Sequence, residues 1–179
     1  MGFYSEAELK NLGFKKIGSN VLISKKASLY GVSQMEIGDN VRIDDFCILS
    51  GNIILGSNIH ISAYVALYGK MGIVLEDFTG ISPRSTVFSA MDDFSGEYLI
   101  GPVHQSHQIN VSGGPVVLKR YSQIGAHSVI FPNLTINEGA VVGAMSLVNK
   151  SVPEWTIVVG VPAKFLKTRS SSLINLVQK

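Results

Sequence analysis

Aliphatic side chains recur at every sixth position over two long stretches of the chain. The members of these two unbroken runs are Ile37, Ile43, Leu49, Leu55, Ile61 and Leu67, then Leu118, Ile124, Ile130, Ile136, Val142 and Val148. Shorter runs with the same spacing are Ile17, Ile23 and Leu29, then Leu75, Ile81 and Val87. A period of six is neither the 3.6 of a helix nor the two of a plain strand. The pattern therefore predicts a short strand and then a corner, repeated many times.

A second regularity concerns the residues beside each aliphatic side chain. Four positions further on, the side chain is usually small or apolar, as at Val41, Cys47 and Ala140, and strand alternation points it inward as well. Glycine often follows the aliphatic residue, as at Gly38 and Gly56, and permits the positive φ or the close approach that a corner needs. Because one coil buries little surface alone, stacked coils must share a core. With three hexads to a coil, about six coils of a triangular prism are predicted, over residues 17–87 and 116–153.

Both ends of the chain depart from this pattern. Ser5 is followed three positions later by Glu8, which forms a capping box and predicts a short N-terminal helix over 5–12 that covers the first coil. Pro162 suits the first turn of a helix, and apolar residues follow it with helical spacing, so a C-terminal helix is predicted over 162–179. We expect a single domain over residues 1–179.

The stretch from residue 88 to residue 115 is the long interruption of the repeat. It contains Asp92, Asp93, His104 and His107, and thus half of the four histidines. Loops of this length are usually either functional or disordered, and apolar residues such as Tyr98 argue against disorder. The sequence therefore predicts an arm that leaves the prism to reach a partner or to cover a cleft.

The amino-acid composition limits the binding partners and the cellular location that can be expected. Only 16% of the 179 residues are charged and the net charge is +2, which argues against nucleic acid or an anionic membrane surface as a partner. The single cysteine, Cys47, excludes an internal disulfide, and its inward position favours a core role over that of a nucleophile. No window is apolar enough to span a bilayer and no signal peptide is recognised, so a cytoplasmic protein is expected.

Three segments carry a further pattern: Ile124-Gly-Ala-His-Ser, Val142-Gly-Ala-Met-Ser and Gly160-Val-Pro-Ala-Lys. They resemble the ends of hexapeptide-repeat acyltransferases, in particular the galactoside and maltose O-acetyltransferases and the O-antigen acetyltransferases. The resemblance implies an all-β fold, a left-handed parallel β-helix, and a homotrimer with the coenzyme bound between adjacent subunits. Carried onto matching positions, it implies acetyl-CoA contacts at Gly125, Ala126, Gly143, Ala144, Lys150 and Lys164.

The resemblance also implies an activity, namely acetyl transfer from acetyl-CoA to a hydroxyl or amine of a sugar, in surface-polysaccharide or galactoside modification. Such a transfer needs a base that takes the acceptor's proton and a donor that stabilises the oxyanion. Histidine is the natural base near neutral pH. His104 and His107 are therefore candidates, and His107 with Asp93 would form an oriented dyad.

The chain departs from its relatives where their catalytic histidine lies. The sugar acetyltransferases carry a His-Pro-x-His stretch shortly after a hexad start, whereas the matching place after Val87 holds no histidine. Three explanations stay open: His104 or His107 folds back into that place, Asp92 or Asp93 acts as the base there, or the activity differs from that of the relatives. A carboxylate base would need a raised pKa.

Two other interpretations of the repeat stay open. A γ-type carbonic anhydrase would need three histidines around zinc, but His104 and His107 lie in the arm, and His60 and His127 are at outward positions of the coils. We therefore expect no metal. A scaffold without catalysis would make no use of the coenzyme positions. The pattern leaves the identity of the acceptor sugar, and the choice between oxygen and nitrogen, undetermined.

Overall fold

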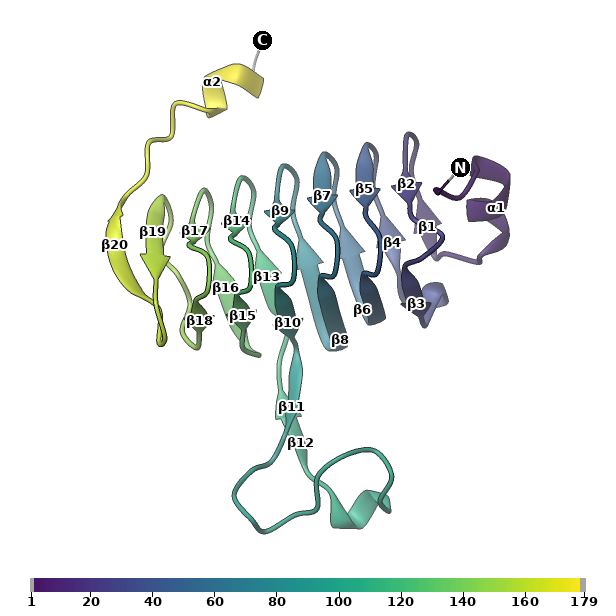
Figure 1. Ribbon diagram of the computed structural model, residues 1–179, viewed down its shortest axis with the longest axis vertical. Coiled ribbons are helices and arrows are strands. Elements are labelled where there is room, and N and C mark those ends of the chain that lie inside the picture. The colour runs from purple at the N-terminus through teal and green to yellow at the C-terminus, as the bar shows by residue number, and fades with distance from the viewer. Residues whose placement is uncertain (1, 178–179) are drawn as a thin grey trace.

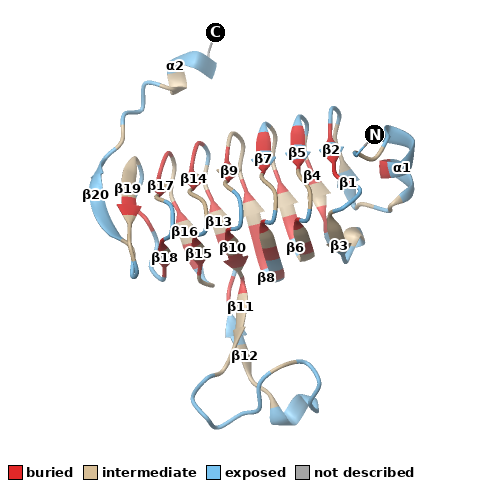
Figure 2. Ribbon diagram, viewed as in Figure 1, coloured by how far each residue is buried: buried red, intermediate tan, exposed pale blue. Residues whose placement is uncertain are grey.

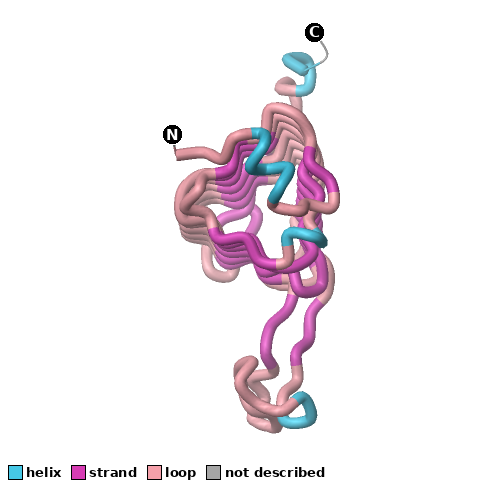
Figure 3. The backbone as a smooth tube through the Cα atoms, turned by 90° about the vertical axis from the view of Figure 1, so that its right-hand side faces the viewer, coloured by secondary structure: helices cyan, strands magenta, loops and turns pink. Residues whose placement is uncertain are grey.

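The computed structural model describes residues 2–177, and these form a left-handed parallel β-helix of about seven turns. Figure 1 shows the turns stacked side by side, with helix α1 (Glu6–Asn11) at one end and an arm leaving the middle. In Figure 3, seen along the stack, successive turns superimpose around one shared interior. The predicted fold class is confirmed. There is one turn more than predicted because strand β19 (Thr156–Val159), which is out of phase with the hexads, completes a further turn.

Eight strands form one face of the prism, and we call it the eight-stranded face. In spatial order they are β2 (Leu22–Ile23), β5 (Val41–Ile43), β7 (Ile59–Ile61), β9 (Gly80–Ile81), β14 (Gln123–Ile124), β17 (Val141–Val142), β19 and β20 (Lys164–Thr168). All of these pairs are parallel except β19 with β20. The hexads stay in register across the face, with Ile43 opposite Ile61 and Ile61 opposite Ile81.

A ten-stranded sheet makes the other two faces, because its longest strands continue around a corner. Its members are β1 (Lys16–Ile17), β3 (Ser28–Tyr30), β4 (Glu36–Ile37), β6 (Ile48–Leu55), β8 (Ala66–Leu75), β10 (Thr86–Phe88), β13 (Val116–Leu118), β15 (Val129–Ile130), β16 (Leu134–Ile136) and β18 (Leu147–Val148). A short 3₁₀ helix, η1 (Val32–Gln34), lies at the same corner early in the chain.

A different corner lies where the chain leaves the eight-stranded face, and we call it the exit corner. It comprises residues 24–27, 44–47, 62–65, 82–85, 125–128 and 143–146.

The aliphatic positions of the repeat build the interior. Leu49, Leu67 and Val87 lie opposite one another on successive turns and are fully buried. Figure 2 shows the buried segments (red) along the strands, while the corners are largely intermediate (tan) or exposed (pale blue) and the arm is largely exposed. Cys47 lies in the same core, and burial raises the pKa of its thiol to about 11. A buried thiol with a raised pKa favours a core role over that of a nucleophile.

Positive φ angles occur at the corners, but not at the glycines of the repeat. A Cβ atom on Gly38 would run into the carbonyl oxygen of Gly56, so these glycines are needed for the close approach of neighbouring turns. The positive φ falls two residues later, at Asn40 (55°) and Asn58 (60°), since asparagine tolerates the left-handed region. The side chains of these two residues form a ladder in which Asn40 Nδ2 donates to Asn58 Oδ1 at 2.7 Å.

The arm and the C-terminal segment differ in how far they match prediction. The arm begins and ends in a hairpin of β11 (Ala90–Asp92) and β12 (Val111–Gly113) and contains a 3₁₀ turn, η2 (Ser106–Gln108).

The predicted C-terminal helix is wrong over Lys164–Thr168. This segment forms β20 and pairs with β19, because the open edge of β19 offers unpaired backbone hydrogen-bonding groups. Helix α2 covers only Ile174–Val177, and residues 178–179 lie outside the described residues. None of the helices described within residues 2–177 has the length and apolar character that a membrane crossing requires.

We expect α1 to lose its cap on acidification. Hydrogen bonds from Lys25 and from Ser5 hold the pKa of the Glu8 carboxyl at about 2, below its ordinary 4.5. Such a group stabilises the fold above its unfolded-state pKa, and this contribution is lost as the pH falls from 4.5 towards 2. The NMR signal of the Leu9 amide, which donates to the Ser5 carbonyl at 2.9 Å, should report the loosening. The Glu8→Gln variant cannot titrate and should lack the step; an equal step in both proteins would contradict the assignment.

Candidate active site

A cavity of about 890 Å³ lies where the arm leaves the prism. Residues of the prism and of the arm line it together, and the rings of Tyr68 and Phe88 form part of its wall. These rings stack with centroids 5.3 Å apart and planes only 12° apart. Lys70 and Asp92 supply charged groups of opposite sign to the same cavity. Its size and its mixture of aromatic and charged lining suit a polar organic ligand.

Asp92 is the acidic residue of this cavity. It is the last residue of β11 and is half-buried. Within residues 2–177 its carboxylate has neither a hydrogen-bond donor nor a cation at ion-pair distance. It can therefore receive a hydrogen bond from a ligand, most strongly from an amine or an ammonium group.

Asp93 is engaged in the structure of the arm itself. Its carboxylate accepts hydrogen bonds from the Ser95 N–H and from Asn110 Nδ2, both at 2.8 Å. Bonds from Ser95 and then Asn110 hold the pKa of Asp93 below its ordinary value. The carboxylate oxygens thus face Ser95 and Asn110 and not His107, so the predicted Asp93–His107 dyad is not formed in the single chain.

The two arm histidines lie beyond the hairpin. His107 is part of η2, His104 precedes it, and both side chains are exposed. Neither residue lines the cavity at the base of the arm. The structure therefore separates His104 and His107 from the cavity that Asp92 lines.

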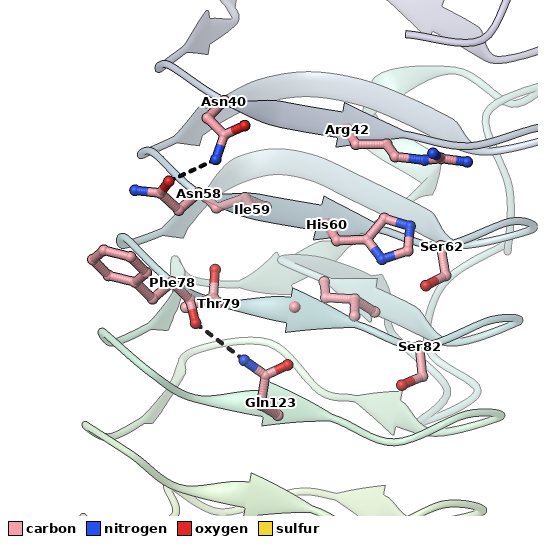
Figure 4. Close-up of a pocket in the computed structure, with 12 residues that line it drawn as sticks. Asn40, Arg42, Asn58, Ile59, His60, Ser62, Phe78, Thr79, Ser82 and Gln123 are labelled. Atoms are coloured by element: carbon pink, nitrogen blue, oxygen red, sulfur yellow. Dashed lines mark hydrogen bonds between the residues drawn. The ribbon is translucent and has the colours of Figure 1, made fainter. Parts of the chain in front are cut away.

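A second hollow, a shallow cleft of about 480 Å³, lies on the eight-stranded face. Figure 4 shows Arg42 and His60 side by side there, with Ser62 and Ser82 at the adjoining corner. His60 Nε2 lies 2.7 Å from Asp44, which also accepts a hydrogen bond from Arg42 Nε at 2.7 Å.

The Asp44 carboxylate holds His60 in a fixed orientation. Burial acts to raise the pKa of Asp44, but the hydrogen bonds from His60 and Arg42 outweigh it and hold that pKa below its ordinary value. The outward position predicted for His60 is confirmed, since its side chain is exposed, but its pairing with Asp44 was not predicted from the sequence. The available signal was spacing, since Arg42 and His60 are directly opposite in paired strands.

The positions assigned to the coenzyme by resemblance fall mostly on the exit corner. Gly125 and Gly143 allow close packing of turns, because a Cβ atom on Gly125 would lie 2.5 Å from the Ala144 N atom. Ala126 and Ala144 belong to successive turns of this corner, joined by the bond from Met145 N to the Ala126 carbonyl at 2.8 Å.

The two predicted lysines are placed differently. Lys164 opens β20, opposite Val159 at the end of the eight-stranded face. Lys150 follows β18, at the opposite end of that strand from Ala144. The structure therefore places Ala126 and Ala144 on neighbouring turns, puts Lys164 on the outermost strand of the same face, and sets Lys150 apart on a different corner. Within residues 2–177, no group of three or more histidine, cysteine or acidic side chains is arranged to hold a metal ion.

The sequence is similar to curated proteins over most of its length. No family model matches the sequence. The dTDP-4-amino-4,6-dideoxy-D-glucose acyltransferase of Escherichia coli is 40% identical over 179 residues, which cover 98% of this chain and 93% of the relative. The galactoside O-acetyltransferase of Escherichia coli strain K12 is 26% identical over 151 residues, covering 81% of this chain and 69% of the relative.

Solved structures of AntD, an N-acyltransferase from Bacillus cereus, superimpose on nearly the whole chain. Its complex with dTDP and 3-hydroxybutyryl-CoA has a TM-score of 0.96 and 53% sequence identity, covering 99% of this chain and 95% of AntD. A variant in complex with dTDP-4-amino-4,6-dideoxyglucose and coenzyme A has a TM-score of 0.97 and 52% identity with the same coverage. The AntD structures include variants of one serine and of one aspartate.

Proposed function

The chain belongs to the hexapeptide-repeat acyltransferase family, and we propose that it transfers an acyl group from acyl-coenzyme A to the amine of a dTDP-4-amino-4,6-dideoxy sugar. The observation that carries this proposal is the similarity over nearly the full length to two proteins that act on or bind this sugar nucleotide. The O-acetyltransferase of galactosides is a more distant relative, so an amine acceptor is favoured over the hydroxyl implied by the earlier resemblance.

The cavity at the base of the arm supports an amine acceptor. The amine attacks the thioester carbonyl, an N–C bond forms, the C–S bond breaks, and coenzyme A leaves as a thiol after it receives the proton lost by nitrogen. The nitrogen gains positive charge as its bond to carbon forms. A carboxylate beside it stabilises that charge and accepts the proton. Asp92, whose carboxylate faces the cavity without a partner among the described residues, is the group we assign to this role.

We further propose that the site is completed between chains of a homotrimer. Asp92 lies beyond β10, whereas the exit corner that carries Ala126 and Ala144 lies before β15, which pairs with β10. A coenzyme on the exit corner is therefore separated from Asp92 of its own chain by the width of a face, roughly 10 Å for a three-residue strand. A neighbouring chain can bring its arm to that corner. Sedimentation or light scattering should show three chains if this is right.

Direct assay with defined substrates tests the proposed function. The protein is incubated with dTDP-4-amino-4,6-dideoxyglucose and either acetyl-CoA or 3-hydroxybutyryl-CoA, and free thiol and the mass of the amide product are followed. A dTDP-sugar with a hydroxyl in place of the amine, and a simple galactoside, serve as matched acceptors. Acylation of the amino sugar alone is the expected result, and the preferred thioester identifies the acyl group. Turnover of the hydroxyl acceptors with none of the amine would overturn the proposal.

A further inference from the structure

Side chains at the third position of the exit corner form one column along the prism. Backbone hydrogen bonds tie each corner to the preceding one, as from the Arg84 N–H to the Ala63 carbonyl at 3.2 Å and from the His127 N–H to the Pro83 carbonyl at 3.0 Å. From one end to the other, the column contains Lys26, Phe46, Tyr64, Arg84, His127 and Met145. Arg84 is therefore one turn before the corner that contains Ala126.

Arg84 is held in place by an aromatic stack. Its Cζ atom lies 4.8 Å from the centroid of the Tyr64 ring, and Tyr64 stacks on Phe46 with centroids 4.9 Å apart and planes at 26°. At the far end Lys26 lies 5.2 Å over the Phe46 ring and is paired with Asp45 at 2.8 Å. A guanidinium that lies on a ring keeps its N–H groups free for bonds at its edges. The stack thus restricts the Arg84 side chain without using its donors.

The free donors of Arg84 distinguish it from the other three arginines. Arg42 donates to Asp44, Arg169 donates to two backbone carbonyls, and Arg120 donates to a tyrosine hydroxyl. Across the described part of the chain, the Arg84 guanidinium has no such acceptor. An arginine fixed by stacking but left without an oxyanion is preorganised for a planar bidentate partner.

We propose that Arg84 binds the diphosphate group of a substrate of this acyltransferase. The inference rests on the proposed function, in which both substrates carry a diphosphate and neither carries a carboxylate. The exit corner one turn further on holds the proposed coenzyme positions, about 4.8 Å away along the stack. The acceptor must approach the same corner to reach the thioester. Arg84 is thus within reach of either diphosphate, and Tyr64 is its positioning residue.

Binding measurements on the full chain show which substrate supplies the diphosphate, the dTDP-sugar or the acyl-coenzyme A. Calorimetric titrations with dTDP and with coenzyme A are carried out on wild type, Arg84→Gln and Arg84→Lys, with thermal melting as the check on folding. We expect Arg84→Gln to lower the affinity for one ligand by about 10- to 100-fold and to leave the affinity for the other unchanged. A loss of this size is expected when a charge-assisted contact is removed. Arg84→Lys should recover only part of the loss, because lysine keeps the charge but not the planar fork.

Two further comparisons test the mechanism of the effect. Tyr64→Leu removes the ring beneath Arg84 and should weaken the same ligand, whereas Tyr64→Phe keeps the ring and should bind as wild type. Thymidine and pantetheine lack the diphosphate, so their binding should not respond to Arg84→Gln. A loss confined to dTDP assigns Arg84 to the acceptor, and a loss confined to coenzyme A assigns it to the donor. Unchanged binding of both by a folded Arg84→Gln protein overturns the inference, while a wild type that binds neither ligand instead refutes the proposed function.

Discussion

Asparagine in place of Asp92 is expected to lower kcat/KM for acyl transfer by about 100- to 10,000-fold, the usual effect of removing a general acid or base. The substitution keeps the size of the side chain and the end of β11 but removes the negative charge that faces the cavity at the base of the arm. Because charge and proton acceptance act as the N–C bond forms, the loss should fall mainly on kcat. Steady-state kinetics at saturating acyl-CoA measure kcat and kcat/KM for the acceptor.

The neighbouring carboxylate provides a matched control. Asp93→Asn makes the same chemical change one residue away, where both oxygens already bond to the arm. It should loosen the arm and lower thermal stability, with a far smaller loss of kcat than Asp92→Asn. An Asp92→Asn protein with full activity would contradict our assignment of the proton acceptor.

The histidines are tested in the same assay, since the sequence makes His104 and His107 candidate bases. His104→Gln and His107→Gln should remain close to wild type if the arm serves only to carry Asp92 and to cover the cavity. His60→Gln tests the one histidine that a carboxylate orients, at 2.7 Å from Asp44. If His60→Gln abolishes turnover while Asp92→Asn retains it, the proton acceptor lies on the eight-stranded face.

Truncation of Leu67 to alanine is expected to lower the free energy of unfolding by about 2–5 kcal/mol. Leu67 is fully buried in a central turn, opposite Leu49 on one side and Val87 on the other. Each neighbour is itself held by the next turn, so the prism has little freedom to collapse into the cavity. Chemical denaturation followed by circular dichroism measures the change.

Leu67→Met is the matched control, because it conserves side-chain volume and should cost less than about 1.5 kcal/mol. Equal destabilisation by Leu67→Ala and Leu67→Met would show that the cavity is not the cause. A Leu67→Ala protein as stable as wild type would mean that neighbouring turns do repack.

The sequence was sufficient for most of the fold because its pattern is local and repeats. In each hexad the aliphatic residue marks the inward position, as at Ile43, Ile61 and Ile81. Stacking follows because one coil buries little apolar surface by itself. The capping box at Ser5 and Glu8 is equally local, and both of its hydrogen bonds are present. The C-terminal segment shows the opposite case. Its apolar spacing is helical, yet Lys164–Thr168 pairs with β19 because an open strand edge lies beside it.

In the candidate site, too, the sequence determined some features and the tertiary structure decided others. By itself the sequence determined that the arm interrupts the prism after Val87 and that Asp92 and Asp93 enter it, since a break in a strict period is visible in one dimension. Only the tertiary structure decided which carboxylate is free, because strand alternation and the bonds from Ser95 and Asn110 commit Asp93 and leave Asp92 facing the cavity. It likewise decided that Arg84 lies on Tyr64, since residues some twenty positions apart become neighbours only when one turn is placed on the next.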